Sequence, residues 1–257
     1  MRKMTNPEDL KKIANELRRE LVIKHYESKM AHLGSDLSCL DILISLYFNV
    51  MGGKDRFILS KGHAALGLYA VLHKKGIMTD DIYASLGKDG SMLGEHPIYG
   101  IKGIEAATGS LGHGLSISAG MALSKKLDDE DGHVYVLLSD GECQEGSTLE
   151  AMNFIGRINL DNITAIVDSN KWQAFDRTLM PMGKIKDEFS SAGWDTFEID
   201  GHDFRQLCSA LSKNSSKPIM VVANTLLGKG IKAIEDKLIA HYKPPTKEQI
   251  NDFISGF

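Results

Sequence analysis

Apolar residues recur along this chain with two different periods, and the clearest helical period lies near the N-terminus. Four apolar residues share one face of that segment at helical spacing: Leu10, Ile13, Leu17 and Leu21. Asn6 is placed to cap a helix and Pro7 fits its first turn. The pattern therefore predicts a helix that begins after Asn6. A similar apolar face predicts a second helix over residues 38–51.

Short apolar runs bounded by glycine and polar residues predict strands. The first run covers residues 57–59, and four later runs cover 134–138, 163–167, 196–199 and 219–223. Helical stretches near 145–157 and 203–213 lie between the later runs. This alternation predicts an α/β fold, with a parallel sheet and helices on both of its faces. Residues 87–114 hold eight glycines, and we expect this loop-rich stretch to build a binding edge.

The composition indicates a folded protein with a sizeable core. Of its 257 residues, 42% are hydrophobic and 25% are charged, which suits a single domain over residues 1–257 with a polar C-terminal tail from about residue 243. A formal net charge of −4 gives no reason to expect nucleic acid or an anionic membrane as a partner. The three cysteines are widely separated, and no segment approaches the ~20 apolar residues that span a bilayer. We therefore expect a soluble, cytoplasmic protein with reduced thiols.

The most informative stretch, HVYVLLSDGECQEGSTLEAMNFIGRINLDNITAIVDSNKWQ, covers residues 133–173. It predicts a strand, a tight acidic turn, a helix and a second strand, so that Asp140 and Asn170 follow neighbouring strands. Carboxylate and amide oxygens at that edge suit Mg²⁺, which usually shares its ligands with substrate phosphates. The simpler interpretation is that Asp140 and Glu142 only cap the following helix. A Gly228-Lys229-Gly230 turn after a later strand is placed to approach a phosphate or to act as a plain left-handed turn.

These residues carry a family resemblance. The spacing from Asp140-Gly141 to Asn170 resembles the thiamine diphosphate signature, in which GDG is followed about thirty residues later by Asn. KDRFILSKGHAALGLYAVL (54–72) and GEHPIYGIKGIEAATGSLGHGLSISAGMALSKKL (94–127) are similar, in order and spacing, to the N-terminal half of transketolases. The resemblance runs from about residue 10 to residue 241. It implies the thiamine-diphosphate-binding fold, with thiamine diphosphate and Mg²⁺ (or Mn²⁺ or Ca²⁺) as cofactors.

The resemblance also implies roles for single residues. Four histidines match residues of the family's catalytic pocket and substrate channel: His32, His63, His96 and His241. The implied cofactor contacts are His63, Gly109, Leu111, Asp140, Gly141, Asn170 and His241, and the implied metal ligands are Asp140, Asn170 and the Trp172 carbonyl. Glu145 and Glu150 match acidic residues at the family's subunit interface. Histidine suits proton transfer in both directions near neutral pH.

Four positions depart from the family pattern, and one of them is Ile98, which follows His-Pro where Glu is frequent. Ser139 replaces the first glycine of the signature, and His113 replaces a usual glutamine. Asp36 stands where a small neutral residue is usual, so it either selects an unusual acceptor or caps the following helix. His25, His73 and His133 are interpreted as structural residues, and His202 as a loop or cap residue.

The chain stops at Phe257 and so resembles the N-terminal half of a split transketolase. We expect it to be inactive alone and to work as an α2β2 heterotetramer with a C-terminal subunit that supplies the pyrimidine-binding domain and the activating glutamate. The implied reaction moves a two-carbon ketol unit from a ketose, free or phosphorylated, to an aldehyde or ketone acceptor, and the departures point to a specialised sugar. The alternatives are the alpha chain of a split 2-oxoacid dehydrogenase or decarboxylase, and a non-catalytic cofactor-domain partner.

Overall fold

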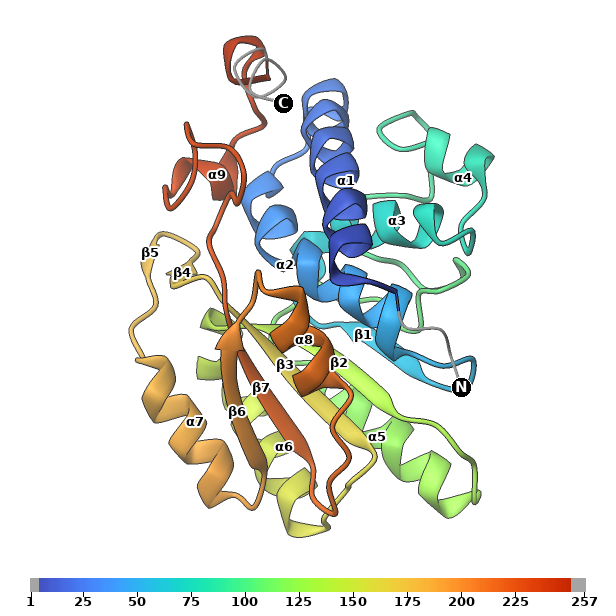
Figure 1. Ribbon diagram of the computed structural model, residues 1–257, viewed down its shortest axis with the longest axis vertical. Helices are drawn as coiled ribbons and strands as arrows, with labels where there is room; N and C mark the ends of the chain where they lie inside the picture. Colours follow the sequence, from blue (N-terminus) through green and yellow to red (C-terminus); the bar gives the residue numbers. More distant parts are fainter. Residues whose placement is uncertain (1–4, 251–257) are drawn as a thin grey trace.

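A five-stranded parallel sheet forms the centre of the protein, whose computed structural model describes residues 5–250 (Figure 1). Its strand order is β1-β2-β3-β7-β6. The strands are β1 (Arg56–Leu59), β2 (Val134–Ser139), β3 (Ile163–Ser169), β7 (Ile219–Asn224) and β6 (Asp195–Asp200). Every pair runs parallel, and all five strands lie where the apolar runs predicted them.

Helices cover both faces of the sheet (Figure 1). One face carries α1 (Pro7–Ser28), α2 (Leu33–Ser45), α3 (Ala65–Lys74) and α8 (Phe204–Leu211). The other carries α5 (Gly114–Leu127), α6 (Gly146–Arg157) and α7 (Met182–Ser191). Alternate strand residues feed the two cores: Leu137 and Val221 face the first, and Val136 and Val222 face the second. The predicted α/β architecture is confirmed.

The first helix begins as its sequence signals predicted, but the second does not. Asn6 caps α1 by accepting a hydrogen bond of 3.1 Å from the amide of Glu8. The second helix was expected from residue 38, whereas α2 begins at Leu33 and ends in a π-helical turn over Leu46–Val50. Every residue of α2 is buried, so it has no exposed polar face whose period could mark its ends.

The stretch Leu33–Val50 has the length and composition of a membrane span, with 18 residues and a mean hydropathy of 1.3. This corrects the expectation that no segment approaches that limit. Within the described structure 83% of the stretch is buried, because α2 packs against both α1 and α3. A helix that is apolar on all sides is typical of a protein core as well as of a membrane.

Smaller elements surround this framework. They are a 3-10 turn (Gly62–Ala64), α4 (Asp80–Ala84), a second 3-10 turn (Gly141–Gln144), the hairpin of β4 (Trp172–Gln173) and β5 (Asp176–Arg177), and α9 (Ile239–Tyr242). The glycine-rich stretch 87–114 is loop up to the start of α5, as predicted. In the expected polar tail, Pro245 and Ile250 are buried within the described part, and the tail continues past the described residues.

Candidate active site

A pocket of about 500 Å³ opens at the carboxyl edge of the sheet. Nine of the residues predicted for the catalytic, cofactor or metal site line it together: His32, His63, His96, Gly109, Leu111, Gly141, Asn170, Trp172 and His241. They come from widely separated regions of the chain, because parallel strands bring their carboxyl ends to one side. Asp140 does not line the pocket surface but lies fully buried beside Gly141. The sequence-predicted site is therefore assembled in one place.

The four predicted histidines form a cluster. The ring centroid of His32 lies 5.4 Å from that of His63, 6.3 Å from that of His96 and 5.1 Å from that of His241. The His63 and His241 rings are 5.5 Å apart. At such distances the imidazoles surround one small volume, so they can act on the same bound molecule.

Local backbone geometry holds this cluster. His32 adopts a left-handed conformation, with φ of 69°, at the N-cap of α2, and its amide donates to the carbonyl of His241 over 3.2 Å. A β carbon at Gly109 would lie 3.1 Å from the His96 ring, so the glycine leaves space beside that ring. The buried Nδ1 atom of His32 has no hydrogen-bond partner among the described residues. A buried polar atom without a partner is costly, and a bound cofactor or substrate would satisfy it.

Burial lowers the pKa of three histidines of the cluster. Burial, followed by the charge of Lys61, lowers the pKa of His63 well below its usual value. Burial and the neighbouring His32 lower the pKa of His241 to about 4. The pKa of His32 is also lowered by burial, although Glu95 and Asp36 oppose the change. Neutral imidazoles at pH 7 can accept a proton, which is the state that a general base requires.

Asp140 follows β2 and has the surroundings of a cation ligand. Its Oδ1 accepts from the amide of Gly141 at 2.9 Å, and its Oδ2 accepts from the amide of Lys171 at 2.5 Å. Among the described residues it forms no ion pair. Burial, helped by the charge of Asp168, raises the pKa of Asp140 to about 7. A divalent cation would compensate this buried carboxylate.

Asn170 lies at the end of the neighbouring strand, where β3 leaves the sheet. Its Oδ1 accepts from the amide of Trp172 at 3.0 Å, and Lys171 between them has φ of 69°. The carboxylate, amide and carbonyl oxygens of Asp140, Asn170 and Trp172 are hard donors that fit Mg²⁺. No cluster of three His, Cys, Asp or Glu side chains with metal-binding geometry occurs in residues 5–250.

Asp168 organises a buried network that the sequence analysis missed. It pairs with the fully buried Lys61, and Lys61 also donates to the Ser35 carbonyl at 3.1 Å. Ser38 donates to the same carboxylate at 2.6 Å, Thr225 donates to its other oxygen, and the Asn170 amide donates at 3.3 Å. Burial by itself would lower the pKa of Lys61, but the Asp168 carboxylate keeps it raised. The sequence held one feature that could have identified Asp168 as a site residue, which is its position at a strand end two residues before Asn170.

Glu142 anchors the loops around the pocket. Its carboxylate accepts from the hydroxyl of Ser60, from the amide of Gly112 at 2.7 Å and from the amide of Ser139 at 3.3 Å. The Ser139 hydroxyl in turn accepts from the Glu142 amide at 3.2 Å. Glu142 is therefore more than a helix-capping residue. Ser139, which replaces the usual glycine, bonds within the turn and stabilises it.

Asp36 is neither a specificity residue nor a helix cap. It is fully buried, forms a 2.8 Å contact with His25 Nε2 and accepts from the amide of Gly67 at 2.7 Å. Because its side chain is sealed from the pocket, the hypothesis that it selects an acceptor is wrong. The structural interpretation of His25 is confirmed, and His113 is exposed at the N-cap of α5.

The remaining histidines pair away from the pocket. His73 contacts Asp80 at 2.9 Å and His133 contacts the Thr164 hydroxyl at 2.8 Å. His202 lies in a loop as predicted, but it also contacts Asp41 at 2.8 Å. Glu145 and Glu150, expected at a subunit interface, are exposed.

Comparisons with known proteins agree with this geometry. The family model described as "Transketolase, thiamine diphosphate binding domain" matches residues 12–255. The chain is 37% identical over 251 residues to one of the subunits of apulose-4-phosphate transketolase from Phocaeicola vulgatus, covering 92% of this chain and 89% of that protein. It is 34% identical over 255 residues to the SqwG subunit of 6-deoxy-6-sulfo-D-fructose transketolase from Clostridium sp., covering 93% of each. The crystal structure of transketolase from Campylobacter jejuni superposes with a TM-score of 0.91 at 29% identity, over 98% of this chain and 43% of that one.

Proposed function

Because this chain belongs to the transketolase family, as a thiamine diphosphate binding domain, we propose that it is the N-terminal subunit of a split transketolase that acts on phosphorylated or otherwise anionic sugars. The observation that carries the proposal is the cluster of four imidazoles beside Asp140 and Asn170. Two relatives of nearly the same length are named as transketolase subunits. Their names specify apulose 4-phosphate and 6-deoxy-6-sulfo-D-fructose, each an anionic sugar.

The chain's own residues would orient the cofactor and move protons. Thiamine diphosphate, when bound, supplies the carbanion and the electron sink for breaking and forming the C–C bond. His32, His63, His96 and His241 surround the place where the sugar hydroxyl and carbonyl groups would lie. A neutral imidazole can take the proton from a donor hydroxyl and return it to an acceptor oxygen. Because the four rings already enclose one small volume, they provide these groups without rearrangement.

The donor set at the carboxyl edge would hold the diphosphate through Mg²⁺. Asp140, Asn170 and the Trp172 carbonyl would supply the protein oxygens, and the Gly141 amide would donate to the diphosphate. Mg²⁺ commonly binds one or two carboxylates together with phosphate oxygens. Mn²⁺ and Ca²⁺ use similar ligands and would compete for the same position.

A second subunit would complete the pocket. Phe175 is 82% exposed at the pocket rim and stacks on Tyr242, with ring centroids 5.7 Å apart. Exposed aromatic residues are enriched at interfaces. We assign this rim, with Glu145 and Glu150, to contact with a C-terminal transketolase subunit in an α2β2 assembly. That partner would bring the pyrimidine-binding domain and the activating glutamate.

The assembled cluster favours ketol transfer over the alternatives. An alpha chain of a 2-oxoacid dehydrogenase or decarboxylase does not need four histidines to handle sugar hydroxyls, and the family model and the named relatives are transketolases. A non-catalytic partner would not need to keep a proton-accepting cluster and a complete donor set in one pocket.

Calorimetric titration of thiamine diphosphate with Mg²⁺ tests the proposal, using this chain alone and mixed with a C-terminal transketolase subunit from the same organism. We expect tight, metal-dependent binding and ketol transfer only in the mixture. Asp140→Ala should strongly weaken the binding and with it the ketol transfer, whereas Asp131→Ala should change neither, because Asp131 is exposed, pairs with Lys54 and does not line the cofactor pocket. Failure of the mixture to bind the cofactor, or turnover of pyruvate in place of a ketose, would contradict the proposal.

A further inference from the structure

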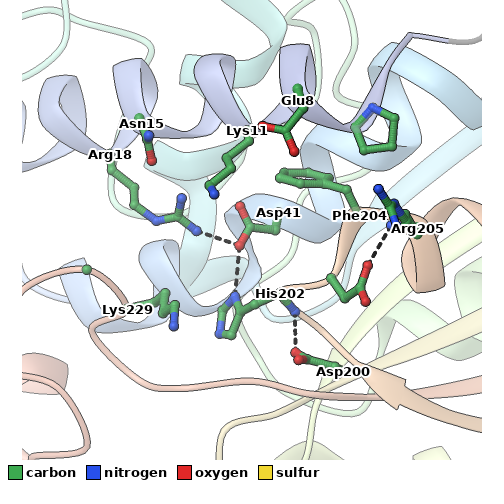
Figure 2. Close-up of a pocket in the computed structure, with 13 residues that line it drawn as sticks. Glu8, Lys11, Asn15, Arg18, Asp41, Asp200, His202, Phe204, Arg205 and Lys229 are labelled. Carbon is green, nitrogen blue, oxygen red and sulfur yellow. Dashed lines mark hydrogen bonds and ion pairs between the residues drawn. The ribbon is translucent and has the colours of Figure 1, made fainter.

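A second pocket, of about 600 Å³, lies at the same carboxyl edge but beside β6 (Figure 2). It is bounded by α1, by α8 and by the turn after β7, and it shares no lining residue with the cofactor pocket. A cavity of this size accommodates a small metabolite. The Gly228-Lys229-Gly230 turn, with φ of 73° and 97° at its glycines, brings Lys229 to its wall.

The floor of this second pocket is a buried polar triad. Arg18 donates to Asp41 at 2.5 Å, and His202 Nδ1 contacts the same Asp41 oxygen at 2.8 Å (Figure 2). His202 Nε2 accepts from the Leu226 amide at 3.0 Å, so its proton lies on Nδ1 and points to Asp41. Arg18 is 7% exposed and Asp41 is 2% exposed. The triad is therefore held rigidly from three directions.

Two buried atoms of the triad are left without partners among the described residues. They are Nε of Arg18, which is a donor, and Oδ1 of Asp41, which is an acceptor. Buried polar atoms nearly always form hydrogen bonds, to protein, water or ligand. An unused donor beside an unused acceptor suits a ligand that carries both an anionic oxygen and a hydroxyl group.

Cations that form no ion pair with the described residues lie around the triad. Three further cations, Lys11, Arg205 and Lys229, line the pocket, and none has a side-chain ion pair in residues 5–250.

Most of the carboxylates that line this pocket are already engaged. Asp41 holds Arg18 and His202, Asp200 accepts from the His202 amide at 2.8 Å, and Asp203 caps α8. Within residues 5–250, Glu8 is the one lining carboxylate whose side chain accepts no hydrogen bond. The lining holds four cations and four carboxylates in all, but Asp200 and Asp203 accept from backbone amides of their own segment, so Lys11, Arg205 and Lys229 are left, with Glu8, to meet a ligand.

We infer that this second pocket binds a small phosphorylated polyol, separate from the cofactor and the reacting sugar. Lys11, Lys229 and Nε of Arg18 bind the phosphate, since ammonium and guanidinium groups form strong charge-assisted bonds to phosphate oxygens. Oδ1 of Asp41 accepts from a hydroxyl of the polyol. Lys11 and Arg18 extend from α1 toward Asp41, and Lys229 lies beside His202, on the same side of the Asp41–His202 pair as Arg18 (Figure 2).

Titration of the full chain with glycerol 3-phosphate, followed by protein amide NMR shifts at constant ionic strength, tests this site. We expect saturable shifts around Arg18 and His202 in the wild-type protein. Lys11→Gln and Lys229→Gln should each weaken binding by about five-fold or more, because each removes one phosphate contact. Neither lysine is buried, so neither substitution should unfold the protein.

Matched variants separate this site from the cofactor pocket and from general charge effects. Lys12→Gln removes the same charge next to Lys11, but Lys12 is 74% exposed and pairs with Asp9, so its affinity should equal that of the wild type. His241→Ala alters the cofactor pocket and should also leave binding unchanged. The inference is overturned if glycerol 3-phosphate does not saturate, if Lys12→Gln weakens it as much as Lys11→Gln, or if His241→Ala abolishes it. If inorganic phosphate binds with the same affinity as glycerol 3-phosphate, the inference that the pocket recognises a polyol hydroxyl is wrong.

Discussion

Asp140 and Asp168 stand at the ends of neighbouring strands, and both are fully buried. Asp168 is saturated: Lys61 neutralises it, and Ser38, Thr225 and Asn170 donate to it. Asp140 receives two backbone amides and no other donor within the described residues. The two carboxylates are one residue apart in strand register, since Ser139 pairs with Asp168. Asp168 therefore stabilises the fold, whereas Asp140 remains available to bind a cation.

This difference shows how a protein keeps a buried charge available for a ligand. A protein cation beside Asp140 would stabilise the carboxylate but would also compete with a metal. Lys61 is directed to Asp168 instead and donates to the Ser35 carbonyl. The Asp168 network in turn holds the Asn170 amide, so that the amide oxygen keeps one orientation. Stabilisation and ligand binding are assigned to different side chains.

The largest effect should come from removing the saturated carboxylate. Asp168→Ala leaves Lys61 buried without a counter-charge, and breaking a buried pair in this way costs about 3–5 kcal/mol. The free energy of unfolding, measured by chemical denaturation, should fall by that amount. A loss below about 1 kcal/mol would mean that the pair is not buried in solution.

Acid should produce the next largest effect on stability, through a histidine that neither carboxylate contacts. Burial lowers the pKa of His133 from 6.5 to about 4, although Asp55 and Asp161 oppose the change, so the unfolded chain binds the proton more tightly than the folded one. The corresponding stability is present above pH 6.5 and is lost as the pH falls toward 4, amounting to about 3 kcal/mol. His133→Asn should remove this share of the loss between pH 6.5 and 4 and leave the share of His241, whose pKa burial also lowers to about 4. An unchanged profile would place the acid-sensitive group elsewhere.

Removing the Asp140 carboxylate should leave the fold intact and lower the affinity for the cofactor. With the partner subunit present, Asp140→Ala should lower the affinity for Mg²⁺–thiamine diphosphate by about 100-fold, or ~2.7 kcal/mol. Its free energy of unfolding without ligand should stay equal or rise, because a buried uncompensated carboxylate is removed. Calorimetry measures the cofactor affinity, and chemical denaturation of the same samples measures the free energy of unfolding. A large drop in stability would show that Asp140 has the same role as Asp168.

The smallest net change should come from replacing the whole buried pair. Lys61→Met combined with Asp168→Leu removes both charges at once and leaves no uncompensated ion. Apolar replacement of a buried pair is often neutral in stability, so the double variant should unfold within about 1 kcal/mol of the wild type. Chemical denaturation of Lys61→Met, Asp168→Leu and the double variant gives the free energies of unfolding for a double-mutant cycle. A double variant as unstable as Asp168→Ala would indicate that the hydroxyl and amide partners, rather than the charge, dominate.

Prediction from sequence succeeded where a residue's role depends on its position along the chain. The strands were found because each is a short apolar run bounded by turn residues, and the central ones are buried on both faces. Asp140 and Asn170 were placed together because parallel strands end on one side of a sheet. The start of α2 was missed because the helix is buried throughout and has no polar face. α7 and the β4–β5 hairpin were not anticipated.

The sequence by itself determined the α/β order of elements and the placing of Asp140 beside Asn170, because these depend on local patterns and on spacing between strand ends. The set of histidines that meet at the carboxyl edge came from the family motifs, which are also read from the sequence. Only the tertiary structure decided which charges pair. Nothing local assigns Lys61 to Asp168, His25 to Asp36 or Arg18 to Asp41, since these partners lie 107, 11 and 23 positions apart. Pairing depends on which side chains share a desolvated space, and that space exists only once the helices have packed on the sheet.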